Sequence, residues 1–260
     1  MPDWNPALYS RYEDERTRPA RELLARVPDS LDGFVSVVDL GCGPGNSTEL
    51  LRRRFRLAEV TGIDNSEAML TAARQRLPGL RFEQADIADW QPEAAPDLIY
   101  ANAALQWVPG HETLLPRLLR LLAPGGALAI QMPDNRDEPT HRLMRELAAE
   151  TPYAQAIGDA AKLRADLLPL AAYYDLLAPL AAQVDVWHTI YQHPLADARA
   201  IVDWVRGTGL RPFVDPLAPD LQARYLAEYE RRIAQAYPAR ADGRRLLAFP
   251  RLFIVAMRKP

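Results

Sequence analysis

A glycine-rich turn between a short apolar run and a polar run is the feature that most constrains this chain. Val35, Val37, Val38 and Leu40 form an apolar run that is rich in β-branched residues and too short for a helix, which suits a strand buried on both faces. The chain then turns through Gly41, Gly43 and Gly45 and enters residues 46–49, Asn-Ser-Thr-Glu, which are typical of a helix start with capping side chains. We expect this turn to leave backbone N–H groups available to a ligand, so the pattern predicts a nucleoside-type cofactor at the carboxyl edge of a parallel sheet.

The spacing of the glycines argues against a dinucleotide. The fingerprint G-x-G-x-x-G requires a third glycine, but Asn46 and Thr48 occupy the two positions where it could stand. Pro44 also removes an N–H group that would face a phosphate. Asp39, at the end of the strand, would repel a pyrophosphate but can accept hydrogen bonds from an ammonium group. S-adenosylmethionine carries an ammonium group, a carboxylate and an adenosine without a phosphate, and it is the cofactor we predict.

Later segments supply further strands that end in polar residues. The run 58–64 ends in Asp64, at the spacing expected for a carboxylate that binds ribose, although Asp64 could instead cap the helix that follows. The run 80–85 leads into Asp86, which is either an adenine-side contact or a turn residue. A fourth strand, 97–102, ends in Asn102, and a fifth is predicted over 126–131.

These five segments, in this order, resemble the class I S-adenosylmethionine-dependent methyltransferases. The resemblance implies an α/β, Rossmann-like sheet of seven strands with the last one antiparallel, flanked by helices, with a helical cap inserted after strands five and six. The turn, the strand ends and this resemblance together give the expected cofactor-binding residues. They are Asp39, Gly41, Gly43, Gly45, Asp64, Asn65, Asp86, Ile87 and Asn102.

The resemblance extends to one family within this superfamily, the trans-aconitate methyltransferases. The segments that carry it are 3–6, 100–107, 131–135, 201–205, 208–212 and 247–256. It implies methyl transfer to a carboxylate of trans-aconitate, a small polycarboxylate, giving a monomethyl ester and S-adenosylhomocysteine. Three alternatives stay open: a methyltransferase for another small carboxylic acid or a carboxylate on an acyl carrier, an oxidoreductase on a doubly wound fold, and a non-catalytic cofactor-binding protein.

The order of elements predicts one domain over residues 1–260 without an independent second domain. We expect a cofactor-binding core over about 30–135 and helical cap insertions over about 136–182 and 195–248. The elements expected outside the first five strands are a helical arm over 4–28, helices over 140–150, 196–206 and 219–236, and strands over 184–191 and 252–257.

Composition limits the partners. Of the 260 residues, 48% are apolar and 25% charged, and the net charge of −3 disfavours nucleic acid as a partner. The single cysteine, Cys42, allows no internal disulfide, and the four histidines lack metal-ligand spacing, so no metal site is predicted. Without a signal peptide or an apolar run of ~20 residues, we expect a cytoplasmic protein that does not contact membranes. No obligate protein partner is evident from the sequence.

The predicted chemistry requires positioning rather than a general base. A carboxylate is already ionised at neutral pH, so the enzyme must orient it and remove its water. Arginine forks are the best clamps for the remaining carboxylates of a polyacid. Trp107, just past the fourth strand, either forms part of the active-site wall or packs against neighbouring apolar residues. The candidate clamps are Arg16, Arg18, Arg136, Arg211 and Arg251, the last expected just before the final strand.

Overall fold

The computed structural model describes residues 13–31, 35–160, 166–207 and 209–260, and the chain divides into two compact units. Unit 1 consists of Met1–Pro133, Leu167–Thr189 and Leu252–Pro260. Unit 2 consists of Asp134–Asp166 and Ile190–Arg251. The division falls within the last two strands, which therefore contribute residues to both units.

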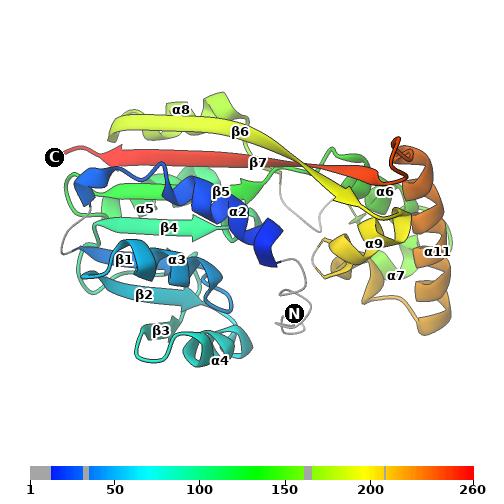
Figure 1. Ribbon diagram of the computed structural model, residues 1–260, viewed down its shortest axis with the longest axis horizontal. Helices are drawn as coiled ribbons and strands as arrows, with labels where there is room; N and C mark the ends of the chain where they lie inside the picture. Colours follow the sequence, from blue (N-terminus) through cyan, green and yellow to red (C-terminus); the bar gives the residue numbers. More distant parts are fainter. Residues whose placement is uncertain (1–12, 32–34, 161–165, 208) are drawn as a thin grey trace. The chain divides into compact units, whose positions relative to one another are not determined.

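Unit 1 is built on a seven-stranded mixed sheet in the order β3-β2-β1-β4-β5-β7-β6. The first five strands pair in parallel, and β7 runs opposite to its neighbours β5 and β6 (Figure 1). This arrangement confirms the predicted fold class, including the antiparallel last strand. The strands are β1 (Ser36–Leu40), β2 (Glu59–Asp64), β3 (Arg81–Gln84), β4 (Leu98–Asn102), β5 (Ala127–Pro133), β6 (Ala181–Leu195) and β7 (Arg245–Arg258).

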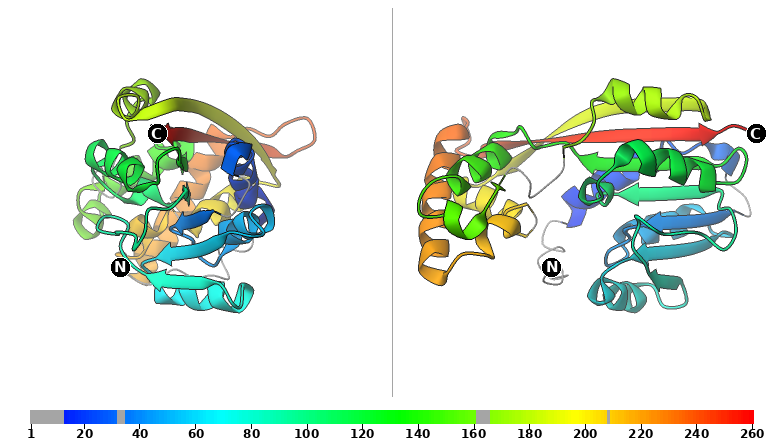
Figure 2. Two further views of the ribbon diagram at one scale, coloured as in Figure 1. Left: turned by 90° about the vertical axis from the view of Figure 1, so that its left-hand side faces the viewer. Right: turned by 180° about the vertical axis from the view of Figure 1, so that it is seen from behind.

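The central strands are buried because helices cover both faces of the sheet, as their largely apolar sequences predict. Helices α2, α3 and α4 lie on one face, while α5 and α8 lie on the other (Figures 1 and 2). The apolar side of α5 contributes leucines that are fully buried in the main core of the sheet. The helices are α2 (Glu13–Leu24), α3 (Asn46–Arg54), α4 (Glu67–Arg76), α5 (His111–Leu121) and α8 (Leu170–Leu177).

The parallel register brings polar strand ends to one edge of the sheet. Asp39 on β1 is aligned with Gly62 on β2 and Tyr100 on β4. Asn102, at the end of β4, is aligned with Gln131 on β5. Because parallel strands all end at the same edge, the turns that follow β1, β2, β3 and β4 meet there.

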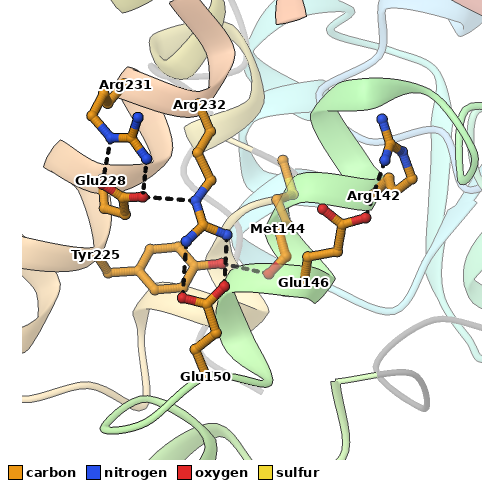
Figure 3. A network of polar contacts seen from close by, with 8 residues as sticks. All are labelled: Arg142, Met144, Glu146, Glu150, Tyr225, Glu228, Arg231 and Arg232. Carbon is orange, nitrogen blue, oxygen red and sulfur yellow. Dashed lines mark hydrogen bonds and ion pairs between the residues drawn. The ribbon is translucent and has the colours of Figure 1, made fainter. Parts of the chain in front are cut away.

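Unit 2 is largely helical, and hydrogen bonds join α6 to α11. The hydroxyl of Tyr225 on α11 donates to the carbonyl of Met144 on α6 at 2.7 Å (Figure 3). Arg232 donates to both carboxylate oxygens of Glu150, at 2.7 and 2.8 Å, and to Glu228 at 2.7 Å. The bonds from Arg231 and Arg232 lower the pKa of Glu228 to about 2. The helices are α6 (Pro139–Ala148), α7 (Ala154–Ile157), α9 (Ala198–Arg206), α10 (Arg211–Val214) and α11 (Pro219–Ala236).

The last two strands are longer than predicted. The expected strands, 184–191 and 252–257, stop short of Pro194 and Pro250, whereas β6 and β7 each run through their proline. Pro194 is tolerated because β6 is the edge strand of the sheet, where an N–H group is not required for pairing. Because β7 begins at Arg245 and continues through Pro250, Arg251 lies inside this strand rather than before it. Of the arm predicted over 4–28, residues 4–12 lie outside the described part of the chain, and the helix α2 covers Glu13–Leu24 and ends four residues earlier than predicted.

No helix among the described residues combines the length and the apolar character that a membrane crossing requires.

Candidate functional site

The turn after β1 uses glycine for two different reasons. Gly41 has φ +71°, and a Cβ atom added there would lie 2.2 Å from the Cβ of Ala104, so the two loops approach too closely for a side chain. Gly43 has φ +54°, but an added Cβ would meet no described atom within 4 Å. Open space above Gly43 is what a ligand that contacts the main chain needs.

The expectation of free N–H groups in this turn is wrong. The N–H groups of Gly41 and Cys42 both donate to the carbonyl of Ile63, at 2.7 and 2.9 Å. The N–H of Gly43 donates to Asp64 Oδ2 at 2.9 Å, and that of Gly45 donates to the carbonyl of Cys42 at 3.1 Å. The N–H groups of the turn are therefore used mainly to bind the end of β2, and few of these donors remain for a phosphate.

Asp39 is completely buried at the end of β1 and has one oxygen to offer. Its Oδ2 accepts hydrogen bonds from the hydroxyls of Ser47 and Thr48, both at 2.7 Å. Its Oδ1 is buried and has no partner among the described residues. Burial raises the pKa of Asp39 to about 6, while the two hydroxyls oppose that increase. An unsatisfied carboxylate oxygen in this position suits a cationic donor.

The first turn of α3 also differs from the sequence expectation. Its N-cap residue is Gly45, and no side chain caps the helix. Ser47 and Thr48 instead donate their hydroxyl groups to Asp39. A buried carboxylate is costly when it lacks hydrogen-bond donors, and these two hydroxyls supply them. The sequence contained a signal for this role that our prediction missed: Ser47 and Thr48 follow Asp39 by eight and nine residues.

Asp64 connects the ends of β1 and β2. Besides accepting from Gly43, the carboxylate accepts the N–H of Ser66 on Oδ1 at 2.9 Å. Ser66 is the N-cap of α4, since its hydroxyl accepts from the N–H of Met69, so Asp64 is not the cap that the alternative proposed. Asp64 is half-buried and Asn65 is exposed, with the Asn65 carbonyl bound by Gln84 at 3.0 Å.

The turn after β3 carries Asp86 and Ile87. Asp86 is exposed, and its Oδ1 accepts the N–H of Ala88 at 2.9 Å, so it acts as a turn residue whatever else it binds. Ile87 is buried, and its Cδ1 lies 3.5 Å from the position that a Cβ of Gly41 would occupy. This turn therefore lies against the glycine turn.

The turn after β4 adds two further acceptor oxygens. Oδ1 of Asn102 and Oε1 of Gln106 are buried and have no partner among the described residues. Ala103 adopts φ +55°, which is rare for a residue with a side chain, and Gln106 donates to its carbonyl at 2.6 Å. Sequence reasoning selected Asn102 but missed Gln106, whose burial in a short 3₁₀ turn, η2 (Leu105–Trp107), could not be predicted from its polarity.

The expected substrate-side residues are distributed over both units. In unit 1, Trp107 is 40% exposed, and the exposed Arg18 pairs with Glu22 at 2.8 Å. In unit 2, Arg136 pairs with Asp166, Arg211 pairs with Asp215 at 3.5 Å, and about a quarter of each arginine side chain is exposed. The remaining two candidates are Arg251, which is buried against the ring of Phe249 at 4.9 Å, and Arg16, whose side chain lies outside the described part.

Neither cysteine nor histidine forms a reactive centre in the described structure. Burial raises the pKa of the Cys42 thiol, so the group stays protonated. Among the described residues, no three His, Cys, Asp or Glu side chains are grouped so that they could hold a metal ion. The edge of the sheet instead has the carboxylates of Asp39, Asp64 and Asp86, buried acceptor oxygens that lack partners among the described residues, and open space over Gly43. This set fits S-adenosylmethionine, which is cationic and lacks a phosphate.

Comparison with known proteins agrees with this chemistry. Residues 37–126 match a family model described as a methyltransferase domain. The chain is 74% identical over 260 residues to the trans-aconitate 2-methyltransferase of Variovorax paradoxus, covering 100% of both chains. It is 69% identical to the protein of the same name from Paracidovorax citrulli, covering 99% of each. Among solved structures it resembles the YcgJ protein from Bacillus subtilis, with a TM-score of 0.59, 12% identity, and coverage of 96% of this chain and 100% of the other, a likeness of fold alone.

Proposed function

The chain belongs to the trans-aconitate 2-methyltransferase family, and we propose that it transfers a methyl group from S-adenosyl-L-methionine to one carboxylate of trans-aconitate. The products are the monomethyl ester and S-adenosyl-L-homocysteine. The substrate assignment rests on full-length identity of 74% and 69% to relatives that carry this name. The observation that carries the cofactor assignment is the buried Asp39, whose Oδ1 has no partner among the described residues.

The residues that would hold the cofactor lie at the carboxyl edge of the sheet in unit 1. Asp64 would accept hydrogen bonds from the ribose hydroxyls, since a carboxylate has about four acceptor sites and this one is half-buried beside Gly43, whose N–H it accepts. Asp39 would interact with the ammonium group as a buried negative charge. Asp86 and Ile87 would border the adenine, and Asn102 would lie toward the sulfonium. Gly43 would let the ligand approach the main chain, and Gly41, Gly45 and Asn65 would form the turns on either side of that approach.

The chemistry needs little from the protein beyond orientation. When bound, the cofactor would supply a sulfonium methyl group, whose bond to sulfur breaks as a carboxylate oxygen bonds to the carbon. The protein must hold that oxygen about 3–3.5 Å from the methyl carbon and in line with the sulfur. A general base is unnecessary because carboxylates ionise near pH ~4. We infer that Trp107, Arg18, Arg136 and Arg211 serve the substrate, with the arginines neutralising its other carboxylates.

We also infer that the protein acts in the cytoplasm on a small-molecule polycarboxylate. A single reduced cysteine, Cys42, is in keeping with a reducing compartment, and the net charge of −3 disfavours nucleic acid as a partner.

A substrate screen tests the proposal. The purified protein is incubated with S-adenosylmethionine labelled on its methyl group and with a panel of small di- and tricarboxylates, and the ester is identified by mass spectrometry. We expect trans-aconitate to give the highest kcat/KM. A higher kcat/KM for another acid or for an acyl-carrier carboxylate would change the assigned substrate but leave the assigned reaction, methyl transfer to a carboxylate, in place. Calorimetric binding of NADH without binding of S-adenosylmethionine would overturn the assignment altogether.

A further inference from the structure

Helix α5 carries two polar side chains, the buried His111 and the half-buried Arg117, and each bonds to main-chain carbonyl groups of a neighbouring turn. Arg117 reaches the turn after β3, and His111 reaches the turn after β4. These are the two turns that carry Asp86, Ile87 and Asn102, which the proposed function assigns to the cofactor. Neither Arg117 nor His111 has a role in that function so far.

Arg117 binds three carbonyl groups of a single turn. Its guanidinium donates to the carbonyls of Ile87 at 2.8 Å, Ala88 at 2.9 Å and Trp90 at 2.7 Å. Three bonds from one planar cation fix the positions of these carbonyls relative to α5, because the guanidinium presents its donors in a rigid fork. The turn that bears Asp86 and Ile87 is therefore anchored from the helix side.

His111 holds the next turn through a chain of hydrogen bonds. Its Nε2 lies 2.9 Å from the carbonyl of Leu105, which can only accept, so Nε2 carries the proton. In the neutral ring Nδ1 is then an acceptor, and it lies 2.6 Å from the hydroxyl of Tyr173 on α8, which donates to it. The Tyr173 oxygen in turn accepts the N–H of Leu168 at 3.2 Å. One tautomer of one buried histidine thus links Leu105 to α8.

The turn that His111 holds needs such support. It includes Ala103 at φ +55°, a conformation that persists for a residue with a side chain only where the surroundings impose it. It also includes Ala104, whose Cβ would lie 2.2 Å from a Cβ on Gly41, so this turn packs directly against the glycine turn.

We propose that α5 is a positioning element for the cofactor, in which Arg117 sets the adenine side of the site and His111 sets the side near the sulfonium. The inference rests on the proposed function. Both are positioning residues, since each acts through main-chain groups of the turns. The two sides should respond separately to substitution, whereas a general loss of stability would affect both sides alike.

The test compares inhibition constants for adenosine and for S-adenosylhomocysteine, together with kcat for methyl transfer. Arg117→Met should raise both inhibition constants by about tenfold, equivalent to about 1.4 kcal/mol, with kcat at saturating cofactor changed less than about threefold. Arg117→Lys, which keeps the charge and part of the bonding, should recover part of the loss. Arg120→Met is the matched control, because Arg120 lies on the same helix with an exposed side chain.

His111→Leu should give the opposite pattern. The adenosine constant should stay near that of the wild type, while kcat falls about tenfold because the reacting groups are misplaced. His111→Gln, which can donate to Leu105 through its amide, should restore most of kcat, and Tyr173→Phe should show a weaker form of the His111→Leu defect. The pH profile of kcat should keep its shape in all three variants, since no proton transfer is lost.

The outcomes separate the inference from the function on which it rests. A wild-type protein that binds neither adenosine nor S-adenosylhomocysteine contradicts the proposed function. If the wild type binds these ligands and Arg117→Met has the same inhibition constants as Arg120→Met, the proposed role of Arg117 is overturned. If His111→Leu raises both inhibition constants and His111→Gln rescues nothing, His111 has no separate positioning role. If Arg117→Met or His111→Leu fails to fold, Arg117→Lys or His111→Gln takes its place, and its inhibition constants and kcat are compared with those of Arg120→Met in the same way.

Discussion

The N–H of Gly43 donates to Oδ2 of Asp64 at 2.9 Å, joining the turn after β1 to the end of β2. This bond places the acidic residue of the second strand beside the one glycine of the turn that has open space above its Cα atom. Asp64 therefore has two functions in our interpretation: it shapes the turn, and it offers its remaining acceptor capacity to a ligand. The first prediction follows from this double role.

Asp64→Ala should weaken binding of S-adenosylmethionine by about 1.5–3 kcal/mol, because charge-assisted hydrogen bonds to the ribose are lost. Isothermal titration calorimetry measures the effect. Asp175→Ala, at an exposed position on α8, is the control and should bind like the wild type. Unchanged affinity in a folded Asp64→Ala protein would rule out the ribose assignment.

Asp39→Asn should stabilise the ligand-free protein at neutral pH. The native pKa of about 6 lies above the ordinary 3.8, so the folded state binds more protons than the unfolded state between these values. The wild-type free energy of unfolding therefore receives an unfavourable contribution of about 3 kcal/mol above pH ~6, which disappears as the pH falls toward ~4. The difference between Asp39→Asn and wild type should shrink over that range.

Urea unfolding at several pH values measures this difference. The same substitution removes the buried negative charge, so affinity for S-adenosylmethionine should fall by about tenfold or more even though the protein is more stable. A variant that is less stable than the wild type at every pH would contradict the assignment of Asp39 as a destabilising buried carboxylate. Retained affinity would contradict its role toward the ammonium group.

Gly43→Asn should fold but lose the cofactor. Asparagine tolerates the left-handed conformation that φ +54° requires, and its Cβ would meet no described atom within 4 Å. The side chain would instead occupy the space assigned to the ligand, so we expect affinity to fall by about tenfold or more while the melting temperature changes by only a few degrees. Gly125→Asn, at φ +77° before β5, is the matched control with similar open space.

If Gly43→Asn binds S-adenosylmethionine as tightly as Gly125→Asn does, the turn does not contact the ligand. Gly41→Ala should behave differently from both, because its Cβ would lie 2.2 Å from that of Ala104. That variant should lose stability whether or not cofactor is present, which thermal unfolding would record.

At least one of the arginine substitutions Arg211→Met, Arg18→Met and Arg136→Met should impair recognition of trans-aconitate. Methionine keeps an apolar stem but removes the fork, and leaving a desolvated carboxylate without its partner costs about 2–5 kcal/mol, so kcat/KM should fall at least about tenfold. The affected variant should also discriminate less between tri- and dicarboxylates. Steady-state kinetics on both acid classes provide the measurement.

Arg142→Met is the control for this series, since Arg142 is more than half exposed on α6 and pairs with Glu146 one helical turn away (Figure 3). Wild-type kinetics in all three test variants would mean that the clamp lies elsewhere or that the substrate is not a polyacid. Arg136 and Arg211 are the stronger candidates, because their side chains are less exposed than that of Arg18 and a desolvated pair contributes more.

The sheet was predictable because its signals are local. Each of the first five strands is short and ends at a turn whose residues are adjacent in the sequence, so the strands could be placed to within a few residues, even where, as in β3, most of the strand is polar. The helix over 219–236 was predicted with its observed bounds because Pro219 marks its first turn and its apolar residues recur at helical spacing. The end of β6 was underestimated because whether a strand can continue through Pro194 depends on its lying at an edge of the sheet, which the sequence does not show.

The sequence by itself determined the cofactor class, since the missing glycine, Pro44 and Asp39 all disfavour a pyrophosphate at the turn. Only the tertiary structure decided how the site is built. Ser47 and Thr48 bond to Asp39, Asp64 holds Gly43, and α5 holds two turns through Arg117 and His111. Each of these relationships joins groups that face one another only after the parallel strands have aligned their carboxyl ends. A hydrogen bond depends on distance and direction in space, and a pattern along one chain records neither.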